Sequence, residues 1–290
     1  MATIVNFALS FSHSSSMFRH DEPLSSPRNF SRERSRVSAN SSLQIKTNDP
    51  VCLRVSENYS TPDMKKKYKN DNERIKRIHS LEEFDEHLLF SEEKLVIAHF
   101  STGHYKYNSR IRHFMEEQCI VSNEVKFLYI LANENKKTEQ LCKREKIDEI
   151  PHFIFYRKTA KKINQASGFQ PRKLADDILF YGYDPFSPVV EVKSRDDLEN
   201  LIKVRKLVVV NVVKDWCSPC AKIYPGVIKV ASQMTNKVVF ARINVDENDG
   251  FMGMMREMDV RRVPAFLFFE NGNFCGRYVG SNMSVLIRRL

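Results

Sequence analysis

The sequence predicts an α/β fold present in two successive copies, and three observations lead to this prediction. Strand-like and helix-like segments alternate from residue 73 to the C-terminus. The same order of segments occurs twice, because Leu95 and Leu207 are 112 residues apart and Pro151 and Pro264 are 113 apart. The chain has 290 residues, of which 42% are hydrophobic, and this is enough for two domains with their own cores.

The leading segment of the chain has the composition of an organelle transit peptide. Residues 1–39 are rich in Ser and Arg and poor in acids, and no sustained apolar segment follows a charged start as in a secretory signal. We therefore expect a transit peptide over 1–39, with a disordered tail as the alternative. Residues 40–72, which include Lys65, Lys66 and Lys67, are expected to form a disordered arm or linker.

Charge and hydropathy argue against two classes of partner. The net charge is +10, but residues 1–69 hold eleven Lys and Arg against six Asp and Glu, so half of the surplus lies in the leading segment. No folded region therefore stands out as a basic surface for nucleic acid. No apolar stretch approaches the roughly 18 residues of a membrane span. We expect neither nucleic acid nor a membrane as a partner.

The first copy is expected over residues 73–181. Its expected strands are 75–78, 95–100, 125–131 and 152–156, and its expected helices are 81–89, 109–120, 136–145 and 172–180. Ser80, followed three residues later by Glu83, gives a capping-box pattern that starts the first of these helices. The turn-rich segment 182–188 is the expected linker.

The second copy, over residues 189–290, repeats this order and adds a hairpin. Its expected strands are 189–192, 207–213, 238–245, 265–269 and 274–279. Its expected helices follow Ser194, cover 217–235 and 251–258, and end the chain as a short terminal turn. Asn271 and Gly272 form the turn of the hairpin.

A pair of cysteines marks the second copy. Cys217 and Cys220 come just after an expected buried strand and begin an expected helix, so they can close a small disulfide ring and reopen it. The remaining cysteines are scattered, which fits a reducing compartment with a transient, catalytic disulfide. A zinc site would need a second Cys or His pair, and we expect no metal. In the first copy, Tyr105 and Asn108 occupy the two aligned positions.

The second copy resembles thioredoxin over nearly its whole length. The residues that carry the resemblance are Trp216-Cys217-Ser218-Pro219-Cys220, Pro225, Val245-Asp246, Arg262-Val263-Pro264, Asn271-Gly272 and Val279-Gly280. The double layout from about residue 73 onward is most similar to the drought-induced stress thioredoxins of chloroplasts. The resemblance implies two tandem thioredoxin-like domains, each a central mixed sheet with helices on both faces, and a plastid transit peptide before them.

The resemblance also implies the roles of the site residues. Cys217 is expected to be the nucleophile, because a helix N-terminus favours its thiolate, and Cys220 to resolve the mixed disulfide. The residues expected to bind the substrate are Trp216, Val263, Pro264 and Gly280, with Pro264 in a cis peptide bond. Ser218 and Pro219 are expected to support the site. No cofactor is expected.

One supporting position departs from the family pattern. Asn211 stands six residues before the first cysteine, where thioredoxins usually keep a buried Asp. Since Asn cannot take a proton, we predict that Cys220 resolves the mixed disulfide more slowly near neutral pH than in an ordinary thioredoxin.

The expected function is that of a thioredoxin-type protein-disulfide reductase in the chloroplast stroma. Expected partners are disulfide-containing plastid proteins, such as peroxiredoxins and methionine sulfoxide reductases, together with an unidentified thiol electron donor. The expected role is redox homeostasis under oxidative or drought stress. The alternative is a non-enzymatic redox-sensing scaffold or holdase built from tandem thioredoxin-like domains.

Overall fold

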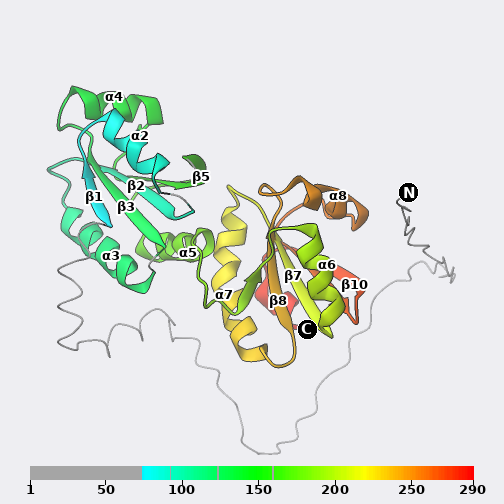
Figure 1. Cartoon of the computed structure of the whole chain (residues 1–290). Coiled ribbons are helices and arrows are strands. Elements are labelled where there is room, and N and C mark those ends of the chain that lie inside the picture. The colour runs from blue at the N-terminus through cyan, green and yellow to red at the C-terminus, as the bar shows by residue number, and fades with distance from the viewer. Residues whose placement is uncertain (1–73, 92, 123, 159) are drawn as a thin grey trace, which may run out of the picture. The chain divides into compact units, whose positions relative to one another are not determined.

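The computed structural model describes residues 74–91, 93–122, 124–158 and 160–290 (Figure 1). These residues form two five-stranded sheets, which lie within one compact unit of the chain. The expected transit peptide, 1–39, and the expected arm, 40–72, lie outside the described residues. Within the described residues, no helix has both the length and the apolar character needed to cross a membrane.

The first sheet, with its four helices, is called the first domain below. Its strands are β1 (Ile75–Ile78), β2 (Leu95–Ser101), β3 (Val125–Leu131), β4 (His152–Arg157) and β5 (Lys161–Ser167). Its helices are α2 (Leu81–Leu89), α3 (Asn108–Val121), α4 (Lys136–Glu145) and α5 (Pro171–Tyr181). The strand order is β1-β3-β2-β4-β5, with β1, β3 and β2 parallel and β4 and β5 antiparallel, so the sheet is mixed.

The helices of the first domain cover both faces of its sheet. Phe84 of α2 and Leu141 of α4 pack on one face, and Ile111 of α3 and Leu174 of α5 pack on the other. All seven residues of β2 are buried, because this central strand has helices on both faces of the sheet. Strands that are covered in this way are mostly apolar along their whole length. Ser80 caps α2 as its sequence pattern predicts, since its side chain accepts a hydrogen bond from the Glu83 amide.

The second sheet and its helices form the second domain. Its strands are β6 (Val189–Glu191), β7 (Leu207–Val213), β8 (Val239–Asn244), β9 (Ala265–Glu270) and β10 (Asn273–Val279). Its helices are α6 (Arg195–Val204), α7 (Ser218–Met234), α8 (Asp249–Glu257) and α9 (Met283–Ile287). The strand order is β10-β9-β7-β8-β6, again with a parallel part and an antiparallel part.

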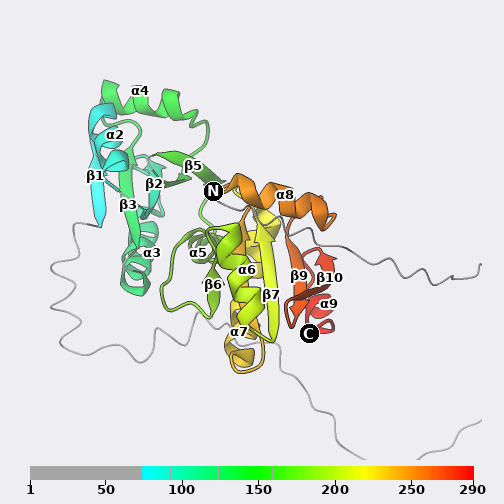
Figure 2. The same cartoon turned by 45° about the vertical axis from the view of Figure 1, so that its right-hand side comes forward.

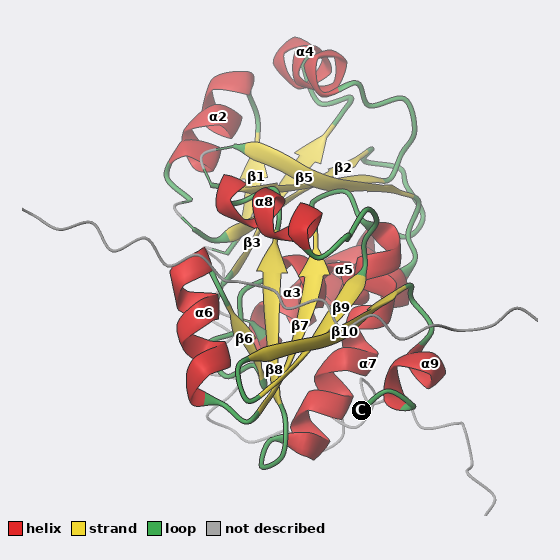
Figure 3. Cartoon of the chain, turned by 90° about the vertical axis from the view of Figure 1, so that its right-hand side faces the viewer, coloured by secondary structure: helices red, strands yellow, loops and turns green. Residues whose placement is uncertain are grey.

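Strand β7 lies in the middle of the second sheet (Figure 2), and it separates two layers of core in the second domain. Val208, Val210 and Val212 face the cluster formed with α6 and α8. Val209 and Val213 face the cluster formed with α7 and α9, because successive side chains of a strand point to opposite faces. Figure 3 shows α6 on one side of this sheet and α7 with α9 on the other.

The fold class expected from the sequence is confirmed, with two differences in the elements. The expected element order omitted β5, an edge strand whose sequence, KKINQAS, contains little apolar alternation and which pairs with β4. Helix α8 begins at Asp249, two residues earlier than expected, because the side chain of Asn248 caps it by accepting a hydrogen bond from the Gly250 amide.

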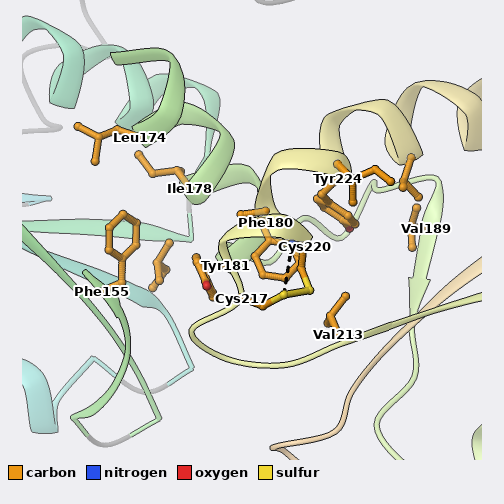
Figure 4. Packing of buried hydrophobic residues seen from close by; sticks show 14 of the residues in the cluster. Phe155, Leu174, Ile178, Phe180, Tyr181, Val189, Val213, Cys217, Cys220 and Tyr224 are labelled. Atoms are coloured by element: carbon orange, nitrogen blue, oxygen red, sulfur yellow. Dashed lines mark hydrogen bonds between the residues drawn. A yellow bond between two sulfur atoms is a disulfide. The ribbon is translucent and has the colours of Figure 1, made fainter. Parts of the chain in front are cut away.

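A single hydrophobic cluster continues from the first domain into the second. Helix α5 packs against α7, and the ring of Phe180 meets that of Tyr224 edge-on, with centroids 5.4 Å apart (Figure 4). The same cluster contains both cysteines of the pair. At its border Glu247 of the second domain pairs with Arg157 at 2.9 Å and with Lys158 at 3.1 Å.

Candidate active site

The two close-spaced cysteines form a disulfide at the start of α7. Cys217 and Cys220 are joined by an S–S bond of 2.06 Å, with their Cα atoms 5.2 Å apart. The strand β7 ends at Val213, and Trp216, with φ of 56°, turns the chain into the helix. Pro219 lies in the first turn of α7, where a missing backbone N–H breaks no helical hydrogen bond.

The helix N-terminus is directed at the sulfur of Cys217. The backbone N–H of Cys220 donates to Cys217 Sγ at 3.3 Å, so Cys217 acts as the N-cap of α7. Both cysteines are buried, while Ser218 and Pro219 between them are exposed and Trp216 is half-exposed. The unsatisfied amides and the dipole of the first helical turn favour negative charge on the N-cap atom.

Pro264 and Gly280 meet through a backbone hydrogen bond. The Val263–Pro264 peptide bond is cis, as the family resemblance predicts, and the Gly280 N–H donates to the Pro264 carbonyl at 3.0 Å. Val263 and Gly280 are half-buried. The first domain repeats this arrangement. The bond before Pro151 is cis, and the Gly168 N–H donates to the Pro151 carbonyl at 2.8 Å.

Asn211 lies inside the sheet beneath α7. It is fully buried in β7, on the same face as Val209 and Val213. Among the described residues, neither its amide nitrogen nor its amide oxygen has a hydrogen-bond partner. The side chain that the sequence singled out is therefore fully buried, and an amide cannot serve there as a base.

The equivalent loop of the first domain holds no thiol. Asn108 stands where the second domain has Cys220, and it closes the loop by accepting from Ser101 Oγ at 2.6 Å and donating to the Thr102 carbonyl at 2.7 Å. His99, at the position of Asn211, is buried against Phe153, with ring centroids 4.7 Å apart. Burial lowers the pKa of His99 to about 3, so its ring is neutral.

Three residues of the first domain reach the active-site loop, and sequence analysis did not find them. Lys161 Nζ pairs with Asp215 Oδ2 at 2.7 Å. The Ile163 carbonyl accepts a hydrogen bond from the backbone N–H of Trp216 at 2.9 Å. Tyr181 belongs to the same buried cluster as Cys217 (Figure 4). No local pattern marks these residues, because their contacts depend on how the two sheets pack.

A buried arginine joins the domains a short way from the disulfide. Arg242 of β8 pairs with Glu191, donates to the Phe180 carbonyl at 2.6 Å, and lies 4.6 Å from the centre of the Tyr224 ring. Burial acts to lower the pKa of Arg242, but Glu191 and Tyr224 outweigh it, so the guanidinium stays charged. Sequence analysis did not single out this residue, because nothing in its local pattern marks it as buried.

Comparison with known proteins identifies the family. The Thioredoxin family model matches residues 189–290. The chain is similar to the thioredoxin-like protein CDSP32, chloroplastic, of Arabidopsis thaliana, with 43% identity over 75% of this chain and 72% of that protein. It is also similar to thioredoxin-T of Drosophila melanogaster, with 34% identity over 34% of this chain and 63% of that protein. The X-ray structure of Fasciola hepatica thioredoxin is 31% identical, over 35% of this chain and 95% of that one, with a TM-score of 0.32. The chain therefore belongs to the thioredoxin family, as a thioredoxin-type thiol–disulfide oxidoreductase that acts on disulfide-containing proteins.

Proposed function

We propose that this chain reduces disulfides of plastid proteins, with Cys217 as the nucleophile and Cys220 as the resolving thiol. The observation that carries the proposal is the Cys217–Cys220 disulfide at the N-terminus of α7. A helix N-terminus lowers the pKa of a thiol, and the thiolate is the attacking species in disulfide exchange. The hydrogen bond from the Cys220 amide to Cys217 Sγ supports the assignment of Cys217 as the sulfur that carries the charge.

The reaction transfers two electrons through a mixed disulfide. The Cys217 thiolate attacks one sulfur of the target disulfide, so a new S–S bond forms and the other target sulfur leaves as a thiolate. The thiolate of Cys220 then attacks Cys217 Sγ, which closes the Cys217–Cys220 disulfide and releases the second target sulfur as a thiolate. Each thiolate that leaves takes up a proton from water. A thiol donor then reduces the closed disulfide for the next cycle.

We assign target binding to the surface around the cis proline. Trp216 offers a large, half-exposed apolar side chain next to the nucleophile. Val263 and Gly280 are half-buried beside the buried Pro264, and the Gly280 N–H donates a hydrogen bond to the Pro264 carbonyl. Ser218 and Pro219 are exposed between the cysteines, so an incoming target disulfide meets no bulky side chain there.

The proposed setting is the chloroplast stroma. The similar Arabidopsis thaliana protein is described as chloroplastic, and the Ser-rich, acid-poor leader of this chain supports import into a plastid. By the resemblance to drought-induced stress thioredoxins, we propose peroxiredoxins and methionine sulfoxide reductases as targets. The role would be redox homeostasis under oxidative or drought stress.

Trapping of the mixed disulfide tests this function. The full chain with Cys220→Ser, incubated with a plastid extract, should accumulate target proteins on Cys217 that dithiothreitol releases. The matched control is Cys275→Ser, which removes an exposed cysteine of β10 and should leave turnover unchanged and trap nothing. The proposal fails if Cys220→Ser yields no reducible adducts on Cys217.

A second variant separates reduction from binding alone. The double variant Cys217→Ser with Cys220→Ser should lose all disulfide reduction. If it still binds and protects the same client proteins as the native chain, the redox-sensing scaffold or holdase described above is the better account.

A further inference from the structure

The active-site loop of the second domain is held by the first domain. The loop runs from Asp215 to Cys217, between β7 and α7. Its backbone and its carboxylate are bound by Ile163 and Lys161 of the first domain, and Tyr181 of that domain belongs to the same hydrophobic cluster as Cys217. The first domain, which has Tyr105 and Asn108 at the positions of the cysteine pair, therefore contacts the loop that holds this pair in the second domain.

The backbone contact comes from an irregularity in the edge strand β5. In the β4–β5 ladder, Phe155 pairs with Asn164 and Tyr156 pairs with Lys162, so Ile163 is an extra residue with no partner opposite. Such a bulge redirects the backbone groups of a strand. Here the Ile163 carbonyl leaves the ladder and accepts the hydrogen bond from the Trp216 N–H. This bond holds Trp216 in its left-handed conformation beside the nucleophile.

The ionic contact compensates a carboxylate close to the nucleophile. Asp215 is buried, its Oδ1 accepts from the side chain of Asn244, and its backbone N–H donates to Asp246. Two acidic side chains thus lie on the second-domain side of the loop. A negative charge near a thiol raises the pKa of that thiol, because it disfavours a second negative charge. Lys161 supplies the opposing positive charge from β5.

The third feature is a buried hydroxyl of the first domain in the same cluster as Cys217. Tyr181 ends α5 with only 3% of its surface exposed, and among the described residues its Oη has no hydrogen-bond partner. Burial raises the pKa of Tyr181, against a smaller opposing effect of the Cys217 backbone amide, so the hydroxyl keeps its proton. Figure 4 shows Tyr181 beside the disulfide. A buried donor without an acceptor is costly, and the Cys217 thiolate of the reduced protein would be an acceptor within the same cluster.

We propose that the first domain completes the active site, with Tyr181 and Lys161 as positioning residues for the Cys217 thiolate of the reduced protein. Tyr181 donates its hydroxyl proton to the thiolate in a hydrogen bond, and Lys161 neutralises Asp215 beside it. Both effects favour the thiolate over the thiol. The inference rests on the proposed role of Cys217 as the nucleophile, and it gives the domain without the cysteine pair a direct part in the chemistry.

The test is the pH dependence of Cys217 alkylation in the reduced full-length chain. Iodoacetamide reacts with the thiolate, and mass spectrometry of the Cys217 peptide separates this thiol from the other cysteines; Cys220→Ser removes its neighbour. We expect Tyr181→Phe and Lys161→Met each to move the midpoint of the profile upward by about 0.5 to 1 pH unit, which is a loss of about three- to tenfold in thiolate at a pH below the midpoint.

Two control variants match these changes. Lys158→Met also removes a lysine that pairs across the domains, but its partner is Glu247, and Tyr224→Phe removes a hydroxyl from the same cluster on the Arg242 side. Both should leave the alkylation midpoint in place. Lys161→Arg should keep the native midpoint, because it keeps the positive charge beside Asp215. Asp215→Asn combined with Lys161→Met should also have the native midpoint, because it removes the negative charge that Lys161 compensates.

The inference is overturned if Tyr181→Phe and Lys161→Met have the same midpoint of Cys217 alkylation as the two control variants. If Lys161→Met does not fold, Tyr181→Phe and Lys161→Arg still decide it, since the phenylalanine variant must shift the midpoint and the arginine variant must not. Alkylation needs no target protein. A chain that traps no targets but shows these shifts therefore refutes the proposed function and leaves the inference standing.

Discussion

Replacing Asn211 by aspartate tests how the buried face of β7 governs resolution of the mixed disulfide. Asn211→Asp keeps the shape of the side chain but puts an ionisable carboxyl at a fully buried position. The guanidinium of Arg242, its register neighbour on β8, is already engaged by Glu191. The new carboxyl therefore lies in a fully buried site with little charge compensation, and its pKa should rise well above the ordinary value.

The size of the effect follows from burial and linkage. An ordinary Asp has a pKa of about 3.9, and full burial raises the pKa of a carboxyl by about 3 units or more. In the unfolded chain the Asn211→Asp carboxyl releases its proton above pH ~4, while in the folded chain it keeps this proton. The free energy of unfolding therefore falls as the pH rises toward the pKa of this carboxyl in the folded chain. At about 1.36 kcal/mol per unit, a rise of 3 units costs about 4 kcal/mol of stability at pH 7 relative to pH 4.

The same carboxyl should speed the second chemical step. A group with a pKa near neutrality beneath α7 can take the proton of the Cys220 thiol, and positioned general bases contribute about 100-fold or more. Single-turnover release of a target from its mixed disulfide, followed between pH 6 and 8, measures this rate. Urea unfolding at pH 4 and pH 7 measures the linked loss of stability.

The control is Asn211→Leu, which removes the amide and adds no base. Since the amide of Asn211 has no hydrogen-bond partner among the described residues, the leucine variant should be more stable than the native chain by about 1 kcal/mol, with no gain in resolution rate. Resolution no faster in Asn211→Asp than in the native chain would refute the prediction that Asn211 slows this step. Equal loss of stability at pH 4 and pH 7 would refute the expected rise in the pKa of the buried carboxyl.

Three further variants test the parts of the fold that support the site. Arg242→Met leaves Glu191 without its cation and takes the donor from the Phe180 carbonyl, so the free energy of unfolding in urea should fall by about 3–5 kcal/mol; a loss below about 1 kcal/mol would contradict the buried pair. Because burial lowers the pKa of His99 to about 3, the unfolded chain binds a proton below pH ~6.5 that the folded chain does not, and stability falls as the pH falls. Between pH 6.5 and pH 5 the free energy of unfolding of the native chain should fall by about 2 kcal/mol more than that of His99→Phe. Parallel pH profiles of the two proteins would contradict this. Leu286→Ala should cost about 2–5 kcal/mol, because this side chain is fully buried and anchors α9; a small loss would mean that the cavity collapses or that the end of the chain contributes little.

Local pattern was sufficient to place the redox centre. The apolar run of β7 is a buried strand because it lies at the centre of the sheet with helices on both faces. Cys217 and Cys220 are one helical turn apart, and this spacing brings residues i and i+3 together on any helix. The cis bond before Pro264 followed from the family resemblance and is confirmed.

The surroundings of the redox centre could not be predicted in the same way. Strand β5 was missed because an exposed edge strand needs no regular apolar alternation. The contact of Ile163 with Trp216 spans two domains and arises at a bulge, which hydrophobic periodicity does not reveal. Arg242 looks like any surface arginine in the sequence, and only its burial against Phe180 and Tyr224 makes it a link between the domains.

The sequence by itself determined the duplicated α/β fold, the cysteine pair and the helix that it caps, because each depends on residues that are neighbours along the chain. The tertiary structure alone decided that Lys161, Ile163 and Tyr181 of the first domain lie against the active-site loop of the second. Those contacts depend on which faces of two separate sheets pack together. Packing of this kind is set by the shape and charge of whole surfaces, and no spacing in the sequence records it.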